Sequence, residues 1–282
     1  MPSFDTPKPI TATVDVVSGD VRVTASERDT TVVEVRPSDA ANDEDVRAAE
    51  RTRVEYAGGH LILKTPKLRS WLPRTSGGSV DVTVELPSGS KLHGAGQLTD
   101  FRAAGPLGEV TITTGLGRIE VEDAETLRIK LGMGDVVLGR VRGNADVTTG
   151  SGHLQLRELD SSAVVKNSNG DTWIGEARGD LRVNAANGSI AVEVAHASTV
   201  AKSANGDVRL GEVVRGSIVL ETRLGDLEVG IREGTAAYLD VRAAAGRVHN
   251  GLEAGDGPGE AADKVEVRAR TTAGNVAIGR PS

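Results

Sequence analysis

The chain has 282 residues, a formal net charge of −7 and no cysteine, which excludes disulfides, thiolate catalysis and cysteine-based zinc sites. The acidic balance and the lack of a Lys/Arg cluster argue against a nucleic-acid site. Aromatic residues make up only 2% of the chain, so we expect a thin interior filled by Val, Ile, Leu and Ala rather than by bulky rings.

Residues 1–92 contain long runs in which apolar and polar side chains alternate, and this period predicts strands with one buried face. The sequence AGGH at residues 57–60 predicts a hairpin turn between two of them. We expect this region to be an antiparallel β module that caps a solenoid, because an open solenoid end would expose unpaired strand edges.

Two further segments of this region are not strand-like. Residues 38–50 (SDAANDEDVRAAE) predict a short helix with Ser38 or Asp39 as its N-cap. Residues 67–78 (KLRSWLPRTSGG) have the composition of an exposed loop, in which Trp71 is a candidate anchor to the strands.

Residues 93–282 repeat a unit made of glycine, a polar residue and a short apolar alternation. GDTWI begins at residue 170, GDLRV at 179 and GSIAV at 188, at intervals of nine residues. The alternation predicts a strand, and the glycine predicts a turn with a positive φ. Such short-period self-similarity is typical of a solenoid. The principal predicted turn glycines are Gly134, Gly152, Gly170, Gly188, Gly206 and Gly225.

The aspartates that follow three of these glycines indicate the length of one rung. Asp135, Asp171 and Asp207 lie 36 residues apart, with His153 and Ser189 halfway between them. A 36-residue rung would stack the carboxylates about 4.8 Å apart, which is unfavourable for like charges. We therefore predict an all-β fold, a parallel β-solenoid (β-helix) of about 18-residue rungs, each with two strands and two turns, and with the N-terminal β module as its cap.

A second register of small side chains stands three residues before the repeat glycines. Stacked copies would form a polar ladder at a tight corner, whereas the alternative is that small polar residues simply populate turns; the sequence leaves both open. The positions are Thr114, Thr149, Asn167, Ala185, Ser203, Thr222, Ala243 and Thr271.

The motifs TTGSGHLQL (148–156), KNSNGDTWIGEARGDLRV (166–183) and SANGDVRLGEV (203–213) carry a family resemblance. With VDVTVELPSGSKL (80–92), they resemble the adhesin-like family of bacterial β-strand-repeat domains of unknown function, in its actinobacterial form. The resemblance covers most of the chain and implies a parallel β-solenoid with a surface or interaction role. It implies no catalytic residues.

The sequence predicts no metal site and no cofactor. The repeated Gly-Asp suggests calcium, but calcium-binding β-rolls need a denser G-G-x-G-x-D pattern. The five histidines show no HxxxH or HxH spacing, and no GxSxG motif is present. The glycines that faintly resemble phosphate loops belong to the repeat.

Trp173 is the main candidate for a partner contact. Its position is held by Arg182, Ala191 and Arg209 in sister units, so it should face outward, and an exposed aromatic side chain can mark a contact site. The alternative is incidental packing under a neighbouring loop. The candidate contact set is Trp173, Asp171, Glu176, Arg182 and Arg209.

We predict a non-enzymatic structural or interaction protein whose rigid solenoid face docks another protein or further copies of itself. The alternative is a carbohydrate-binding or carbohydrate-cleaving β-helix, which would place two or more carboxylates in a groove beside Trp173. We expect no nucleic-acid partner and no membrane insertion, because no apolar run approaches the roughly 20 residues of a membrane helix. The first residues do not read as a signal peptide, so we expect a cytoplasmic location, or the cell surface if an export signal has been removed.

Overall fold

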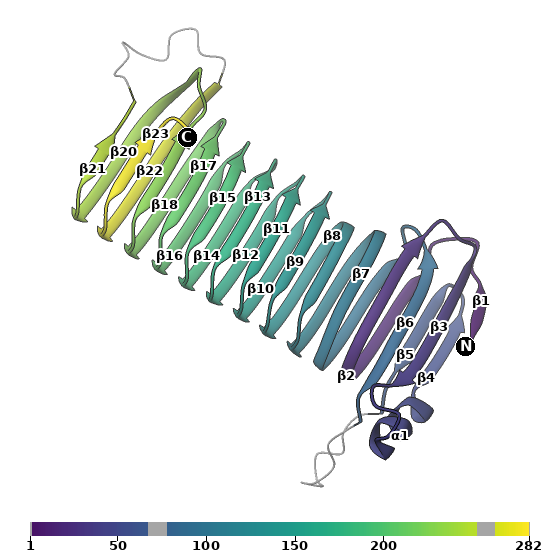
Figure 1. Ribbon diagram of the computed structural model, residues 1–282. Coiled ribbons are helices and arrows are strands. Elements are labelled where there is room, and N and C mark those ends of the chain that lie inside the picture. The colour runs from purple at the N-terminus through teal and green to yellow at the C-terminus, as the bar shows by residue number, and fades with distance from the viewer. Residues whose placement is uncertain (1, 67–77, 253–262, 282) are drawn as a thin grey trace. The chain divides into compact units, whose positions relative to one another are not determined.

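The computed structural model describes residues 2–66, 78–252 and 263–281, which form 23 strands and one short helix (Figure 1). The chain divides into two compact units, Met1–Gly139 and Arg140–Ser282, called the first and second unit below. The domain boundary predicted between residues 92 and 93 falls inside β7 (Lys91–Leu116) and stays a prediction. The loop predicted at 67–78 lies, except for its last residue, outside the described residues.

Three long parallel strands form the body of the first unit. β2 (Thr11–Ser26) pairs in parallel with β7, and β7 pairs in parallel with β8 (Ile119–Met133). In the β7–β8 register Phe101 lies beside Ile119, eighteen residues further on, and both side chains are fully buried. Rungs of the predicted length therefore begin within the first unit.

Shorter strands complete the first unit. β3 is antiparallel to β1 and β6, and β4 is antiparallel to β5 across the turn predicted at residues 57–60. β2 also pairs in parallel with β5 and β6. The N-terminal module thus contains the predicted antiparallel pairs, built around one parallel strand. The bounds are β1 (Ser3–Asp5), β3 (Thr30–Pro37), β4 (Arg53–Ala57), β5 (His60–Lys64) and β6 (Val80–Pro87).

The helix α1 (Asp43–Arg51) forms within the predicted segment but begins later than predicted. Its N-cap is Asn42, whose side-chain oxygen accepts a hydrogen bond from the Glu44 N–H at 2.9 Å. The prediction of Ser38 or Asp39 as the N-cap is wrong, because residues 38–41 form bends and a turn before the helix starts.

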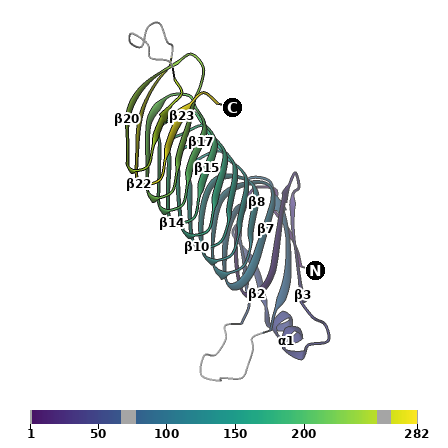
Figure 2. The same ribbon diagram turned by 60° about the vertical axis from the view of Figure 1, so that its left-hand side comes forward.

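Two parallel sheets, the β10 sheet and the β11 sheet, lie on opposite sides of the second unit (Figure 2). Successive strands alternate between them, and most strands pair with the strand eighteen residues further on: Val147 lies beside Val165, and Val165 beside Val183. The predicted parallel solenoid of about 18-residue rungs is confirmed. β9 (Val136–Val141) contains the boundary between the units.

The strands of the β10 sheet are, in spatial order, β10 (Ala145–Ser151), β12 (Ala163–Asn169), β14 (Leu181–Asn187), β16 (Thr199–Asn205), β18 (Gly216–Leu224), β22 (Asp263–Ala273) and β20 (Thr235–Ala245). Those of the β11 sheet are β11 (Leu154–Leu159), β13 (Thr172–Ala177), β15 (Ile190–Ala195), β17 (Val208–Val213), β19 (Leu227–Ile231), β23 (Val276–Gly279) and β21 (Val248–Asn250).

The interior of the second unit is aliphatic. Val165, Val183, Ile174 and Leu210 are fully buried, as the period-2 pattern predicts for the inward side of each strand. The two aromatic side chains of this unit lie on strand faces away from that interior. The low aromatic content thus agrees with a thin core between two sheets.

The last two rungs of the second unit do not stack in chain order. β22 pairs with β18 on one edge and with β20 on the other, and β23 likewise lies between β19 and β21 (Figure 1). The inward side chains of the inserted rung, such as Val267 and Val276, are fully buried. The inserted rung therefore has neighbours on both edges, and the alanine-rich rung of β20 lies at the end.

Candidate interaction surfaces

The turn glycines hold the corners of the rungs. All six predicted turn glycines have positive φ, from 117° at Gly170 to 147° at Gly225, where other residues are strained. At Gly188 a Cβ atom would also lie 2.1 Å from the Gly170 carbonyl oxygen of the preceding rung. Both the conformation and the close approach of two rungs require glycine there.

The small polar residues before these glycines form a ladder between rungs. Ser203 Oγ donates to the Gly188 carbonyl oxygen at 3.0 Å, and Thr222 Oγ1 donates to the Gly206 carbonyl oxygen at 3.0 Å. Asn167 and Thr271 bond in the same way to the glycine one rung away. The polar-ladder interpretation is therefore confirmed at these four positions, whereas Ala185 and Ala243 interrupt the ladder and Thr149 Oγ1 has no hydrogen-bond partner among the described residues.

The aspartates that follow the turn glycines connect one rung to the next. Asp171 Oδ1 accepts the Ser189 N–H at 2.8 Å, and Asp207 Oδ1 accepts the Asp226 N–H at 2.7 Å. In the first unit, Asp100 Oδ1 accepts a backbone N–H of the next rung in the same way. These carboxylates satisfy backbone donors at the bend, so the repeated Gly-Asp has a structural explanation.

An asparagine ladder runs along one exposed corner of the second unit. Asn187 Nδ2 donates to Asn169 Oδ1 at 2.9 Å, and Asn205 Nδ2 donates to Asn187 Oδ1 at 2.7 Å. These side chains use their hydrogen-bonding groups on each other. This corner is therefore polar, rigid and already paired.

Trp173 lies on the outward face of β13, as predicted, but it is half-buried. Its Nε1 donates to Glu193 Oε1 on β15 at 2.9 Å. A Cβ atom on Gly175 would lie 3.1 Å from the indole ring, so the missing side chain of that glycine makes room for it. The ring is fixed in place on the wall of the β11 sheet.

Glu176 belongs to a chain of charged groups at the end of the β11-sheet strands. Its carboxylate is bonded by Arg178 Nη2 at 2.7 Å and by His196 Nε2 at 2.8 Å. Arg178 and Arg140 both bond Asp160. Burial disfavours the Asp160 carboxylate, but the two guanidinium hydrogen bonds outweigh burial and hold the pKa of Asp160 below its ordinary value.

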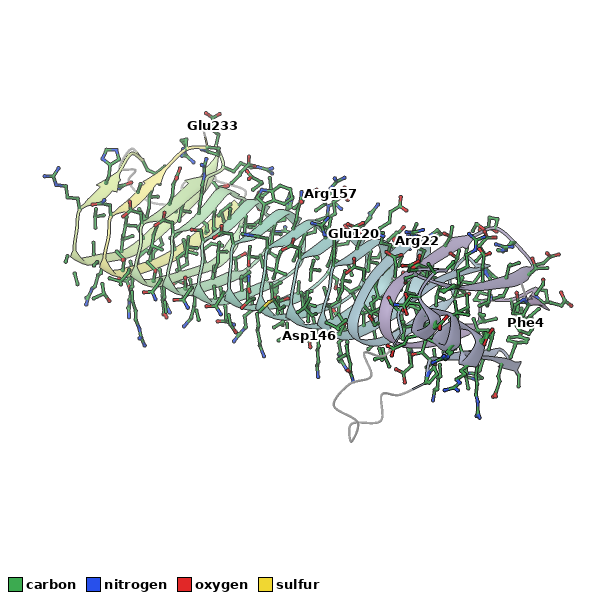
Figure 3. All side chains as sticks on the ribbon, turned by 60° about the horizontal axis from the view of Figure 1, so that its bottom comes forward. Phe4, Arg22, Glu120, Asp146, Arg157 and Glu233 are labelled. Atoms are coloured by element: carbon green, nitrogen blue, oxygen red, sulfur yellow. The ribbon has the colours of Figure 1, made fainter. Side chains whose placement is uncertain are left out.

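The candidate contact residues do not form one site. Arg209 lies on the same wall as Trp173, separated from it by Ala191 in the strand register. Arg182 lies on β14, in the other sheet. Figure 3 shows the two outer faces: Asp146 of β10 and Arg157 of β11 point away from the second unit on opposite sides.

The sequence interpretation missed three exposed apolar side chains at one corner of the first unit. Leu98, Leu116 and Met133 are 58%, 47% and 55% exposed. Leu116 lies beside Met133 in the β7–β8 register, and the glycines on either side of Leu116 pack against the backbone on either side of Leu98. Because adjacent strands are about 4.8 Å apart, the three side chains form a continuous apolar stripe, called the corner ridge below.

The sequence does contain a signal for the corner ridge. Leu116 and Met133 stand in the tripeptides GLG and GMG, and the flanking glycines turn the chain so tightly that the central side chain is left outside. A shallow depression beside the ridge is lined by Leu98 and Leu116 and by the carboxylates of Asp20, Asp81 and Asp100. Asp20 pairs with Arg102, and Asp81 and Asp100 accept hydrogen bonds from Ser38 Oγ and the Arg118 N–H. The ridge thus combines exposed apolar surface with a polar flank.

In the described ranges 2–66, 78–252 and 263–281, no three His, Asp or Glu side chains are arranged to hold a metal ion. Over the same residues, no helix has the length and apolar character needed to cross a membrane.

Comparison with known proteins identifies a family. The profile of the family described as Toastrack DUF4097 matches residues 11–279. No curated protein matches significantly.

Comparison with solved structures gives matches that cover nearly the whole chain at low identity and low TM-score. A "putative cell adhesion protein" from Clostridium sporogenes is 9% identical, with 99% of this chain and 98% of that chain covered and a TM-score of 0.25. A "putative adhesin" from Parabacteroides distasonis is 13% identical, with coverages of 98% and 95% and a TM-score of 0.33. One from Parabacteroides merdae is 11% identical, with coverages of 98% and 94% and a TM-score of 0.34.

Proposed function

The chain belongs to the Toastrack DUF4097 family, and we propose that it is a non-enzymatic protein that presents a rigid β-solenoid surface for docking another protein. The corner ridge carries this proposal. Contiguous exposed apolar side chains on a folded surface mark interaction sites, and these three are held on consecutive rungs of a hydrogen-bonded sheet. A partner would meet a preformed surface and would spend little free energy on ordering it.

The chemistry of the ridge indicates the kind of partner. Leu98, Leu116 and Met133 offer apolar contact, and methionine adapts to irregular partner surfaces. Asp20, Asp81 and Asp100 line the adjoining depression. These carboxylates already have partners within the chain, so a segment with apolar side chains and a polar flank matches both features.

The polar groups of the repeat support a non-enzymatic role. Asp171 and Asp207 bond backbone N–H groups, and Glu176 bonds Arg178 and His196. Carboxylates that accept backbone N–H groups at the bends have a structural role.

A carbohydrate-binding or carbohydrate-cleaving wall stays the alternative prediction. Trp173 is the observation in its favour, but the indole N–H and the nearby carboxylates of Glu193 and Glu176 already bond other side chains. Glycan binding that is lost in Trp173→Ala would favour this alternative. The cytoplasmic location also stays a prediction.

Site-specific photocrosslinking in native cell extract tests the docking proposal. A photoreactive residue at Leu116 should crosslink to a partner protein, and the adduct should disappear when Leu98→Ser and Met133→Ser are added. The same probe at Asn187, on the polar corner of the second unit, is the matched control.

The partner is then identified by mass spectrometry and purified. Its affinity should fall at least about tenfold in L98S/L116S/M133S, since burying one large apolar side chain contributes roughly 1.5–3 kcal/mol. Equal crosslinking at both probe positions, or an unchanged affinity in the triple variant, would contradict docking at the ridge.

A further inference from the structure

The rung formed by β20 and β21 ends the second unit with open edges. Among the described residues, β20 pairs only with β22, and β21 only with β23. The outer edge of β20 therefore presents unpaired N–H and C=O groups along eleven residues. Exposed edges of this kind recruit another strand unless they are protected.

The apolar side chains of this rung are also incompletely covered. Leu239 lies beside Val267 and Val241 beside Ala269 in the strand register. Val267 and Ala269 are fully buried, but Leu239 and Val241 remain partly exposed. Val248 on β21 is 50% exposed. The aliphatic interior of the solenoid thus reaches solvent at this end.

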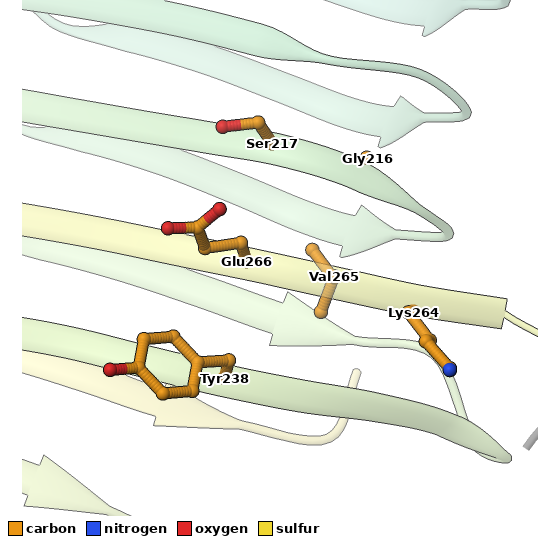
Figure 4. A pocket seen from close by; sticks show the side chains of 6 residues that line it. All are labelled: Gly216, Ser217, Tyr238, Lys264, Val265 and Glu266. Atoms are coloured by element: carbon orange, nitrogen blue, oxygen red, sulfur yellow. The ribbon is translucent and has the colours of Figure 1, made fainter. Parts of the chain in front are cut away.

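Tyr238 adds apolar surface on the outer side of the same edge. Figure 4 shows its ring on β20, with Glu266 and Ser217 on the next two strands. Its side chain is 69% exposed, the largest exposure among the large apolar side chains that the structure describes.

Within the described residues, β20 itself carries little protection against strand pairing. Its sequence, TAAYLDVRAAA, contains no proline and no lysine, the residues that commonly protect an edge strand. Its two charged residues, Asp240 and Arg242, have opposite signs and stand two positions apart. Such an edge is complementary to its own copy in the antiparallel direction.

We propose that this edge binds a second copy of the chain, with the two β20 strands antiparallel around a two-fold axis at Val241. In this register Asp240 lies opposite Arg242 of the second copy, twice, and Leu239 lies opposite the small Ala243. A register centred one residue earlier would place the two Asp240 carboxylates opposite each other, which is unfavourable.

The two-fold arrangement closes the assembly. Each copy uses the same patch, so pairing satisfies both edges and leaves none for a third copy. The exposed parts of Leu239 and Val241 would be covered by their symmetry mates. The β20 edge and the corner ridge are different surfaces, so either proposal can fail without the other.

Sedimentation of the full chain over a wide concentration range tests this proposal. The wild type should form a concentration-dependent dimer and no larger species. Asp240→Arg removes the exposed ion pair of Asp240 with Arg270 in the same chain and places Arg opposite Arg242 of the second copy, so it should raise the dimer dissociation constant at least about tenfold. The double variant D240R/R242D exchanges the charges and should restore the wild-type constant.

Glu221→Arg is the matched control, because Glu221 lies on the same outer face, forms an exposed ion pair with Lys202, and belongs to β18, which has neighbours on both edges. It should leave the dimer unchanged. Circular dichroism of every variant reports whether the fold is kept.

Four outcomes would overturn the proposal: a monomer at all concentrations, an open series of oligomers, a dimer that D240R does not weaken, or a dimer that L116S on the corner ridge dissociates. If a different protein supplies the strand instead, the chain would remain a monomer at all concentrations and that protein would crosslink to β20.

Discussion

The inner rungs and the end rung of the second unit share one sequence pattern but differ in how much of it is buried. In β14, Leu181 and Val183 point inward and are fully buried; in β20, Leu239 and Val241 occupy the same positions in the register and remain partly exposed. The repeat unit thus determines which side chains point inward. Neighbours on both sides of the strand bury those side chains and pair both of its edges. Stability in such a stack depends mainly on interfaces between rungs.

The largest expected difference in stability is between an alanine substitution at a glycine that lies between two rungs and one at a glycine in an open turn. Gly188→Ala should lower the free energy of unfolding by roughly 3 kcal/mol or more, because it combines a positive φ with a collision against the Gly170 carbonyl. Gly234→Ala, also at a positive φ but facing open space, should cost only about 1 kcal/mol. Urea unfolding followed by circular dichroism measures both, and equal losses would show that close approach of rungs is not the cause.

A smaller difference in stability should distinguish an inner rung from the end rung. Val183→Ala removes two methyl groups from a fully buried position and should cost about 2 kcal/mol. Val241→Ala should cost about 1 kcal/mol or less, measured at a concentration too low for two copies to associate. Thermal unfolding of the two variants makes the comparison; a loss at position 241 as large as that at 183 would mean that the end rung is covered in the single chain.

The smallest expected effect concerns pH. The pKa of Asp160 is lowered in the folded chain, so its contribution to stability is fully present above the ordinary value of about 3.9 and is lost as the pH falls through the lowered pKa. Asp160→Asn should remove this part of the acid dependence and change the stability at pH 7 only slightly, since exposed ion pairs contribute little. Thermal unfolding between pH 2 and pH 7 tests it, and parallel curves for both proteins would contradict it.

Most of the repeat could be predicted from sequence because it obeys local rules. The step from Gly170 to Gly188 gives the rung, and the alternation after each glycine gives the inward face. The positions of Ser203 and Thr222 indicated a corner ladder, although only the structure shows that their hydroxyls bond the glycine carbonyls one rung away.

Two features could not be predicted by the same rules. The position of β22 between β18 and β20 is one of them, because a repeat period carries no information about the spatial order of two similar rungs. The corner ridge depends on one residue per rung, such as Leu116, whose exposure follows from the bend rather than from the strand pattern. The candidate set around Trp173 and Arg182 failed to gather because adjacent nine-residue units lie in different sheets.

The inserted rung also has a consequence for synthesis. Chains leave the ribosome N-terminus first, so β20 emerges before β22, the strand on which it must rest. Contacts between neighbouring strands of the regular stack span eighteen residues, but Gly216 meets Val265 across 49, and longer separations form more slowly. This end of the molecule should be completed last, and pulse-labelled hydrogen exchange during refolding should find the amides of β14 protected before those of β20.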